Sequence, residues 1–135
     1  NLSGHKPVPN ICMFTNLTSL SLAGNEAIRD ISPLTNLTSL NLTENIKFEE
    51  ISTLTNLTSL DLALNHKIQD ISMHTGLTSL NLTRNESIQD ISTLTNLTSL
   101  NLLNNKTIQD ISMRRYHLRQ PTGSLRPPLK CVIKW

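Results

Sequence analysis

The sequence repeats itself every 20 residues, and this period constrains the fold more than any other feature. The nonapeptide LTNLTSLNL occupies residues 34–42 and recurs unchanged at residues 94–102, and near copies begin at Phe14, Leu54 and His74. Self-similarity at such a period is typical of solenoids, in which each repeat is one structural unit that stacks on the next. The 135 residues are therefore expected to form one stacked domain.

Three leucine columns run through the aligned repeats, whose common pattern is LTSLxLxxNxxIxDISxLTN. The columns are Leu17, Leu37, Leu57, Leu77 and Leu97; Leu20, Leu40, Leu60, Leu80 and Leu100; and Leu22, Leu42, Leu62, Leu82 and Leu102. The alternation in Leu40-Asn41-Leu42 predicts a short strand with its leucines inward and Asn41 outward. One such strand cannot bury its leucines alone, so we expect the strands to stack about 4.8 Å apart in one parallel sheet.

An asparagine follows each expected strand and forms a fourth column. Its members are Asn25, Asn45, Asn65, Asn85 and Asn105. An unpaired buried amide would cost about 1–3 kcal/mol, so these side chains must find partners. We expect a structural asparagine ladder that bonds turn backbone of its own and neighbouring repeats.

The pattern LxxLxLxxNxxI, seen at residues 37–48 and 77–88, resembles the leucine-rich repeat family, and the flanking IxDISxLTNLTSL is similar to internalin-like repeats of bacterial surface proteins. The resemblance covers nearly all of residues 1–113. It implies an α/β-type leucine-rich repeat solenoid with one parallel β-sheet on the concave side. Internalin-type units are longer, and here Ile follows Asn by three positions rather than two, so a thin convex side of turns, 3₁₀ helix or extended chain is expected.

The same resemblance implies a non-catalytic scaffold for protein–protein interaction at the cell surface or in secreted form, with the concave face as the usual binding surface. The expected partner-binding residues on that face are Asn41, Thr43, Asp61, Asn81, Thr83 and Asn101. Those on the ascending rim, where the repeats differ most, are Glu44, Arg84, His66 and Glu86. The face lacks the aromatic and arginine side chains that dominate interfaces, so a solvated face without a partner is the alternative.

Two polar columns each have two interpretations. The acidic column is Asp30, Glu50, Asp70, Asp90 and Asp110. It could bind cations, but turn capping is favoured because no glycine-rich calcium-repeat pattern accompanies it. The threonine ranks are Thr15, Thr35, Thr55, Thr75 and Thr95, and Thr18, Thr38, Thr58, Thr78 and Thr98. Ice-binding β-solenoids carry such ranks, but hydroxyls that satisfy the stack are the favoured interpretation.

The two ends depart from the repeats. Residues 1–16 are interpreted as a truncated first repeat, because residues 1–11 align with residues 41–51 and the chain opens at a strand; residues 17–113 carry the 20-residue repeats. These ends predict a fragment of a larger recognition or surface protein.

The last segment, residues 114–135, is a basic tail with six Lys or Arg, three Pro and no acid. It is a cap that uses Leu118, Leu125, Val132, Ile133 and Trp135, a disordered basic tail that binds nucleic acid or membrane, or a frameshifted or intron-derived end. The lack of helix or strand spacing favours the last two interpretations.

Catalysis finds little support in the sequence. The histidines His5, His66, His74 and His117 share no metal or triad spacing with Cys or carboxylates, and there is no glycine-rich phosphate loop. His74 replaces a core leucine, and Met73 is expected to turn inward to fill the gap. We expect a non-enzyme without cofactor or metal that binds a protein of unspecified identity.

The repeat body is acidic, with 5 Lys or Arg against 10 Asp or Glu over residues 11–113, so no nucleic acid partner is expected for it. No apolar run is long enough for a transmembrane helix.

Overall fold

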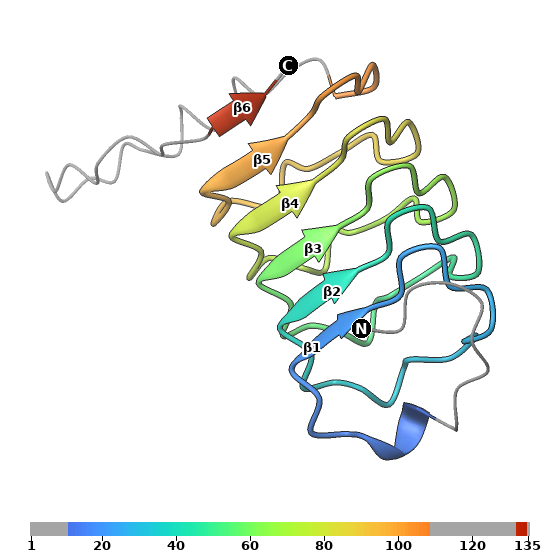
Figure 1. Cartoon of the computed structure of the whole chain (residues 1–135). Helices are drawn as coiled ribbons and strands as arrows, with labels where there is room; N and C mark the ends of the chain where they lie inside the picture. Colours follow the sequence, from blue (N-terminus) through green and yellow to red (C-terminus); the bar gives the residue numbers. More distant parts are fainter. Residues whose placement is uncertain (1–10, 109–131, 135) are drawn as a thin grey trace, which may run out of the picture.

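A computed structural model describes residues 11–108 and 132–134 of the chain. A short 3₁₀ helix, η1 (Ile11–Met13), precedes six strands. The strands are β1 (Ser19–Ser21), β2 (Ser39–Asn41), β3 (Ser59–Asp61), β4 (Ser79–Asn81), β5 (Ser99–Asn101) and β6 (Val132–Lys134). They form one sheet in chain order, and every neighbouring pair is parallel (Figure 1).

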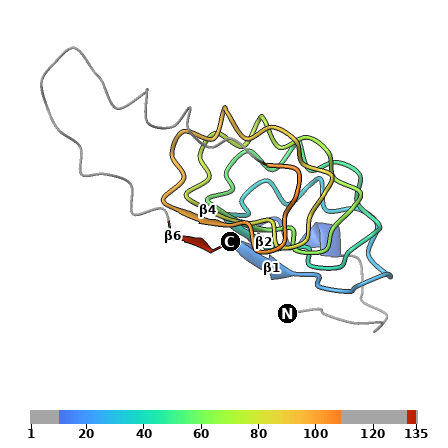
Figure 2. The same ribbon diagram turned by 90° about the horizontal axis from the view of Figure 1, so that it is seen from above.

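Neighbouring strands from β1 to β5 pair with a shift of one whole repeat, so that Leu20 lies opposite Leu40 and Leu40 opposite Leu60. We call each 20-residue unit a coil and number it by its strand, so coil 1 is residues 11–30 and coil 4 is residues 71–90. Seen along the stack, successive coils follow nearly the same path (Figure 2). The repeat therefore sets the register, because any other shift would move the leucines out of their columns.

Each strand of β1 to β5 is only three residues long, and its central leucine is buried while its neighbours face outward. The chain then makes one more inter-coil bond at a residue with left-handed backbone. The φ angles at this position are 58° at Gly24, 56° at Glu44, 55° at Leu64, 51° at Arg84 and 55° at Asn104. The backbone N–H of Glu44, for example, donates to the Ala63 carbonyl over 2.9 Å. This conformation turns the chain away from the sheet three residues after the strand, just before the buried asparagine.

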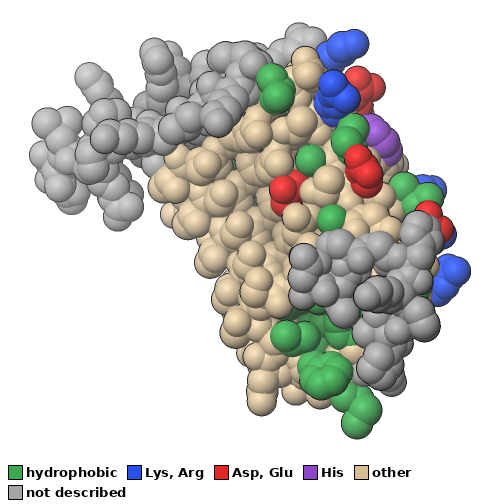
Figure 3. Space-filling view, in the orientation of Figure 1, with side chains coloured by type: hydrophobic (Ala, Val, Ile, Leu, Met, Phe, Trp, Pro, Cys, Tyr) green, Lys and Arg blue, Asp and Glu red, His purple; other side chains and the backbone are tan. Residues whose placement is uncertain are grey.

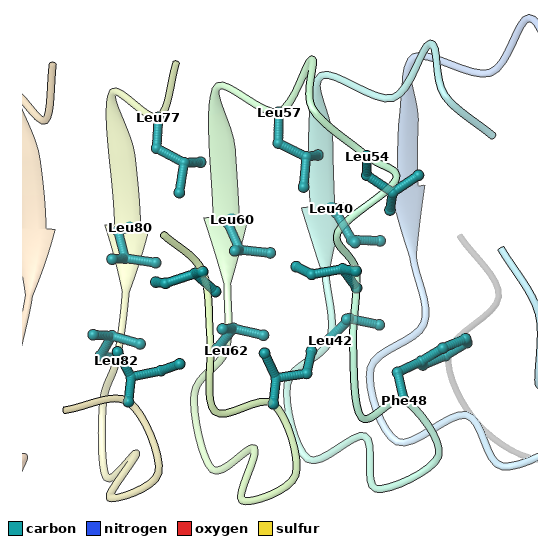
Figure 4. Packing of buried hydrophobic residues seen from close by; sticks show 14 of the residues in the cluster. Leu40, Leu42, Phe48, Leu54, Leu57, Leu60, Leu62, Leu77, Leu80 and Leu82 are labelled. Carbon is teal, nitrogen blue, oxygen red and sulfur yellow. The ribbon is translucent and has the colours of Figure 1, made fainter. Parts of the chain in front are cut away.

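The core lies between the sheet and the opposite side of each coil, which we call the turn side. The leucine columns point into this space, together with the leucines that precede them and the isoleucine columns (Figure 4). Phe48 replaces an isoleucine in one column and is also buried. Turns and bends make up the turn side, and no α-helix occurs in residues 11–108. The predicted leucine-rich repeat solenoid with a thin convex side is thus confirmed.

The end of the chain contributes β6, whose backbone pairs with β5 so that Ile133 lies opposite Leu100. An added strand of this kind agrees with the cap interpretation for residues 132–134. The rest of the basic tail, the last acidic residue Asp110, and residues 1–10 lie outside the described residues. Within the described part of the chain, no helix has the length and apolar character needed to cross a bilayer.

Candidate interaction surface

The sheet face consists of the outward side chains of β1 to β5 and of the residue two positions after the end of each strand, such as Thr43 and Thr83. Asp61 lies in its middle and is the only charged residue at the outward positions of these five strands. Its carboxylate accepts hydrogen bonds from Thr43 Oγ1 over 3.1 Å, from the Ala63 backbone N–H over 2.9 Å and from Asn81 Nδ2 over 3.1 Å. Donors from three successive coils therefore hold one negative charge at a fixed place.

The asparagines of the sheet face are fixed in a similar way. Asn41 Oδ1 accepts from the Thr43 N–H over 2.9 Å, and Asn101 Oδ1 accepts from the Leu103 N–H over 3.1 Å. Asn81 Oδ1 accepts both the N–H and the hydroxyl of Thr83, over 3.1 and 2.7 Å. These bonds close small side-chain-to-backbone turns that hold the side chains in single orientations. The structure brings all six residues that the sequence predicts for this face into one half-buried network or its edge.

The rim lies just beyond the strands, where charged and histidine side chains gather on the right of Figure 3. Glu44 and Arg84 occupy the left-handed position of coils 2 and 4 and are exposed. His66 and Glu86 follow the buried asparagine of coils 3 and 4 and are also exposed. These four predicted residues form a row along the stack rather than one cluster.

Three residues were not among the predicted binding residues: Ile46 and Lys47 at the rim, and Leu103 in the sheet-face column of Thr43 and Thr83. Ile46 and Leu103 are large apolar side chains that are 49% and 41% exposed. Lys47 forms an ion pair with Glu26 of the preceding coil over 3.8 Å. The available signal was an apolar residue in a column that is otherwise polar, since Ile46 shares its column with Glu26, His66 and Glu86.

The asparagine column makes the bonds expected of it. Asn45 Nδ2 donates to the carbonyls of Leu22 and Asn25 in the preceding coil over 3.0 and 2.8 Å. Its Oδ1 accepts from the Lys47 N–H over 2.9 Å. Equivalent bonds to the preceding coil are made by Asn65, Asn85 and Asn105. The column ties each turn to the coil before it and supports the rim from beneath.

The acidic column lies on the turn side, and its described aspartates cap turns. Asp30, Asp70 and Asp90 each accept the backbone N–H two residues later, over 2.9, 2.8 and 2.7 Å. The side-chain and then the backbone hydrogen bond of Ser32 lower the pKa of Asp30 from its usual 3.8. For Asp90 the order is reversed, because the backbone hydrogen bond of Ser92 is the main cause of the lowered pKa. These bonds agree with turn capping, the interpretation that the sequence favours.

The second threonine rank also serves the stack. The hydroxyls of Thr38, Thr58, Thr78 and Thr98 each donate to the threonine carbonyl 20 residues earlier, over 3.0–3.1 Å. Their donors are thus used between coils. No group of three or more His, Cys, Asp or Glu in the described residues could hold a metal ion.

His74 fills the leucine position that the sequence assigns to it, but the expectation about its neighbour is wrong. Met73 is 63% exposed, whereas His74 is fully buried. The repeat register explains this outcome, because Met73 occupies a column that faces solvent in every coil, and turning it inward would displace the chain of the whole turn.

Comparison with known proteins places this geometry among repeat proteins. The family model described as "Leucine Rich repeats (2 copies)" matches residues 15–56, and the model "Leucine Rich repeat" matches residues 53–73 and 74–91. No significant match was found among curated proteins.

Solved structures give the same result. An internalin (inlF) from Listeria monocytogenes is 38% identical over 76% of this chain, with a TM-score of 0.58. A leucine-rich repeat protein from Leptospira interrogans is 36% identical over 73% of this chain, with a TM-score of 0.61. Internalin C2 from Listeria monocytogenes is 32% identical over 67% of this chain, with a TM-score of 0.53. The chain spans 33%, 28% and 44% of those three proteins, respectively.

Proposed function

Because the chain belongs to the leucine-rich repeat family, we propose that it is a non-catalytic scaffold that binds a protein partner through the sheet face and the rim. This fold typically serves as a scaffold for protein interaction. The observation that carries the proposal is the strict register, which sets outward side chains at one fixed position per coil from Ser19 to Asn101.

The mechanism of binding is display on a rigid support. Association loses free energy whenever side chains or loops must be ordered at the interface. Here Asp61, Asn81 and Thr83 are already held by hydrogen bonds to one another or to their own backbone. A partner that fits this arrangement therefore meets little additional ordering cost.

The chemistry of the surface suggests the partner's complementary surface. The single carboxylate of Asp61 at the centre favours a cationic or hydrogen-bond-donating group opposite it. The exposed apolar side chains of Ile46 at the rim and of Leu103 at the edge of the sheet face are suited to apolar contacts. We therefore propose a partner with a donor-rich centre and an apolar margin.

We further propose that the chain acts at a cell surface or after secretion, within a larger protein. The internalin-like resemblance and the internalin structures that it matches support this location. The chain spans less than half of each matched structure.

A capture experiment tests the proposed interaction. The full chain is immobilised, incubated with an extract of its natural environment, and the retained proteins are identified by mass spectrometry. Arg84→Glu on the rim and Asp61→Asn on the sheet face should each reduce capture of a specific partner. Gln89→Glu, a charge change on the turn side, should not. Capture that depends on Gln89 but not on Arg84 or Asp61 would place the binding surface elsewhere and contradict the proposal.

Assays on the same purified protein test two alternative functions. Arrest of ice-crystal growth would favour a structural or ice-binding solenoid that uses the threonine ranks. Binding to nucleic acid or anionic vesicles that falls steeply with salt and is lost on deleting residues 114–135 would favour the basic tail as the active segment. Binding to nucleic acid or vesicles that is equally strong without residues 114–135 would exclude that role of the tail.

A further inference from the structure

Coil 4 departs from the repeat at two nearby positions on its turn side. Residues 74–76 read HTG, whereas the equivalent residues of coils 2, 3 and 5 read LTN. The first departure puts a polar ring into the core, and the second removes a bond between coils.

The first departure places an imidazole in the leucine core. Leu34, Leu54 and Leu94 occupy the equivalent positions, and these side chains and His74 are all 0% exposed. Neither Nδ1 nor Nε2 of His74 makes a hydrogen bond of acceptable geometry, and only a weaker backbone interaction with Leu54 favours the protonated ring. A buried ring nitrogen without a partner is costly, and a second proton on the ring would place an unpaired charge in an apolar core.

The second departure removes a bond between coils. Asn36, Asn56 and Asn96 each donate from Nδ2 to the threonine carbonyl 21 residues earlier, over 2.9 Å. Gly76 has no side chain and cannot make the equivalent bond to Thr55. A Cβ atom on Gly76 would lie 3.5 Å from the Leu57 carbonyl oxygen, which is an ordinary contact. Packing therefore leaves room for an asparagine, and the turn of coil 4 is held less firmly than its neighbours.

A cavity of about 440 Å³ lies beside His74 on the turn side. Its lining includes the carboxylates of Glu49 and Glu50 from coil 2, Asp70 from coil 3 and one cation, Lys67. An imidazolium that moved outward would leave the apolar core and enter an open space with net negative charge. The cavity thus offers the charged ring a better environment than the one it occupies when neutral.

The titration of His74 in the closed coil is consistent with this difference. Burial lowers the pKa of His74 below its usual 6.5, while the backbone of Leu54 and the charge of Asp70 oppose the shift. Because the closed state binds the proton more weakly than the open state does, the closed state is fully favoured above about pH 6.5. It loses stability as the pH falls below that value.

We propose that residues 71–77 form a proton-operated latch, in which protonation of His74 moves its ring from the core into the carboxylate-lined cavity and opens the turn side of coil 4. The sheet stays closed, because the N–H groups of Thr78 and Ser79 keep their bonds to the Thr58 carbonyl over 2.8 and 3.0 Å. The opening loosens the turn side between coils 3 and 4 while the sheet face remains in place. Mild acid thereby makes the stack locally flexible at one chosen coil.

Site-resolved amide hydrogen exchange of the full chain tests the latch. In the closed coil, the His74 N–H donates to the Ile71 carbonyl and the Leu77 N–H to the His74 carbonyl, both over 3.0 Å. The equivalent amides of coil 3 belong to Leu54 and Leu57. After correction for intrinsic exchange, the opening equilibrium at His74 and Leu77 should rise about eightfold from about pH 7 to about pH 5.5, given an ordinary pKa of about 6.5 in the open state. The coil 3 amides should not change.

Three variants separate the latch from general acid sensitivity. His74→Leu restores the repeat and should abolish the pH-dependent rise, while His66→Gln, which replaces an exposed histidine, should retain it. Gly76→Asn restores the bond to Thr55 and should lower opening at both pH values while the rise between them persists. A rise of equal size in coil 3, a rise that survives His74→Leu, or no rise at all would overturn the proposal.

Discussion

The Asn65 side chain makes four buried hydrogen bonds, each to a backbone group. Together these bonds link two coils through polar groups that leucine side chains could not satisfy. Its Nδ2 donates to the carbonyls of Leu42 and Asn45, and its Oδ1 accepts from the N–H groups of Lys67 and Ile68. Apolar packing alone does not specify where a coil turns. The asparagine supplies that information because its amide has both a donor and an acceptor at one point.

Asn65→Leu should therefore destabilise the protein although it adds apolar volume. The substitution leaves buried carbonyls and N–H groups without partners, and we expect a loss of about 3 kcal/mol in the free energy of unfolding. Chemical denaturation measures this loss. The matched control is Asn56→Ala, which removes one exposed bond to Thr35 and should cost less than about 1 kcal/mol. Similar losses in both variants would show that burial of the amide is not the reason for the column.

Gly24 provides a second test at the residue scale, because it has a φ of 58° and a Cβ atom there would touch nothing within 4 Å. Gly24→Val should thus cost about 1–2 kcal/mol through backbone strain alone, since a branched side chain disfavours left-handed backbone. Thermal unfolding measures the change. The reverse substitution, Arg84→Gly, removes a side chain at the same position and should be neutral or stabilising by up to about 1 kcal/mol. A stable Gly24→Val variant would contradict this account of the column.

The role of a single residue can be predicted from the sequence when its polar side chain has only one kind of hydrogen-bond partner within a repeat. The asparagine ladder and the turn-capping aspartates are of this kind, since Asn45 and Asp70 need partners that a turn provides. The left-handed column could not be predicted, because Glu44, Leu64 and Arg84 stand where glycine would have indicated left-handed backbone. The exposure of Met73 could not be predicted either, because the aligned columns, rather than local hydrophobicity, decide which side chain enters the core.

The turns that the aspartates cap are the smallest elements with a pH response of their own. In coil 1, Asp30 Oδ1 accepts the Ser32 N–H over 2.9 Å and the Ser32 hydroxyl over 2.7 Å. The ionised carboxylate is the form that accepts both bonds, so the turn is stabilised above the usual carboxyl pKa of 3.8. That stabilisation is lost as the pH falls through the lowered pKa.

The turns capped by Asp30 and Asp90 should respond differently to loss of their serine hydroxyls. Ser32→Ala should raise the pKa of Asp30 appreciably toward 3.8, because the Ser32 side chain is the main cause of its shift. Ser92→Ala should raise the pKa of Asp90 less, because there the backbone hydrogen bond of Ser92 is the main cause and survives the substitution. Carboxyl-carbon NMR titration of both variants measures the two shifts. A larger effect at Asp90 would reverse the assigned causes.

The strands and the thin turn side follow from the sequence for a clear reason. Leu-x-Leu alternation sets a strand, and the asparagine soon after it ends that strand, so β1 to β5 are short and equivalent. The β6 strand could not be predicted in this way, because Val132, Ile133 and Lys134 belong to no repeat. Its pairing depends on the register of β5, which only the assembled sheet provides.

The proposed binding role rests on the family resemblance, since the residue types of the polar sheet face indicate no particular partner. The hydrogen-bond network around Asp61 explains why residue types alone do not predict the geometry of the sheet face. Its hydrogen bonds with Thr43 and Asn81 link three coils, so their geometry depends on the stack rather than on any one repeat.

At the scale of the whole molecule, the coils contact only their neighbours, so the stack should tolerate removal of one complete repeat. Deleting residues 74–93 joins Met73 to Leu94 and keeps every leucine, isoleucine and asparagine column in phase. We expect this variant to fold with one coil fewer and a lower denaturation midpoint, and to lose the acid-induced opening because it lacks His74. Deleting residues 74–83 instead joins Met73 to Arg84 and breaks the 20-residue phase, which places polar residues at core positions. Circular dichroism and NMR dispersion should show a folded protein in the first case and loss of structure beyond coil 3 in the second. Equal folding of both variants would mean that the period does not set the register.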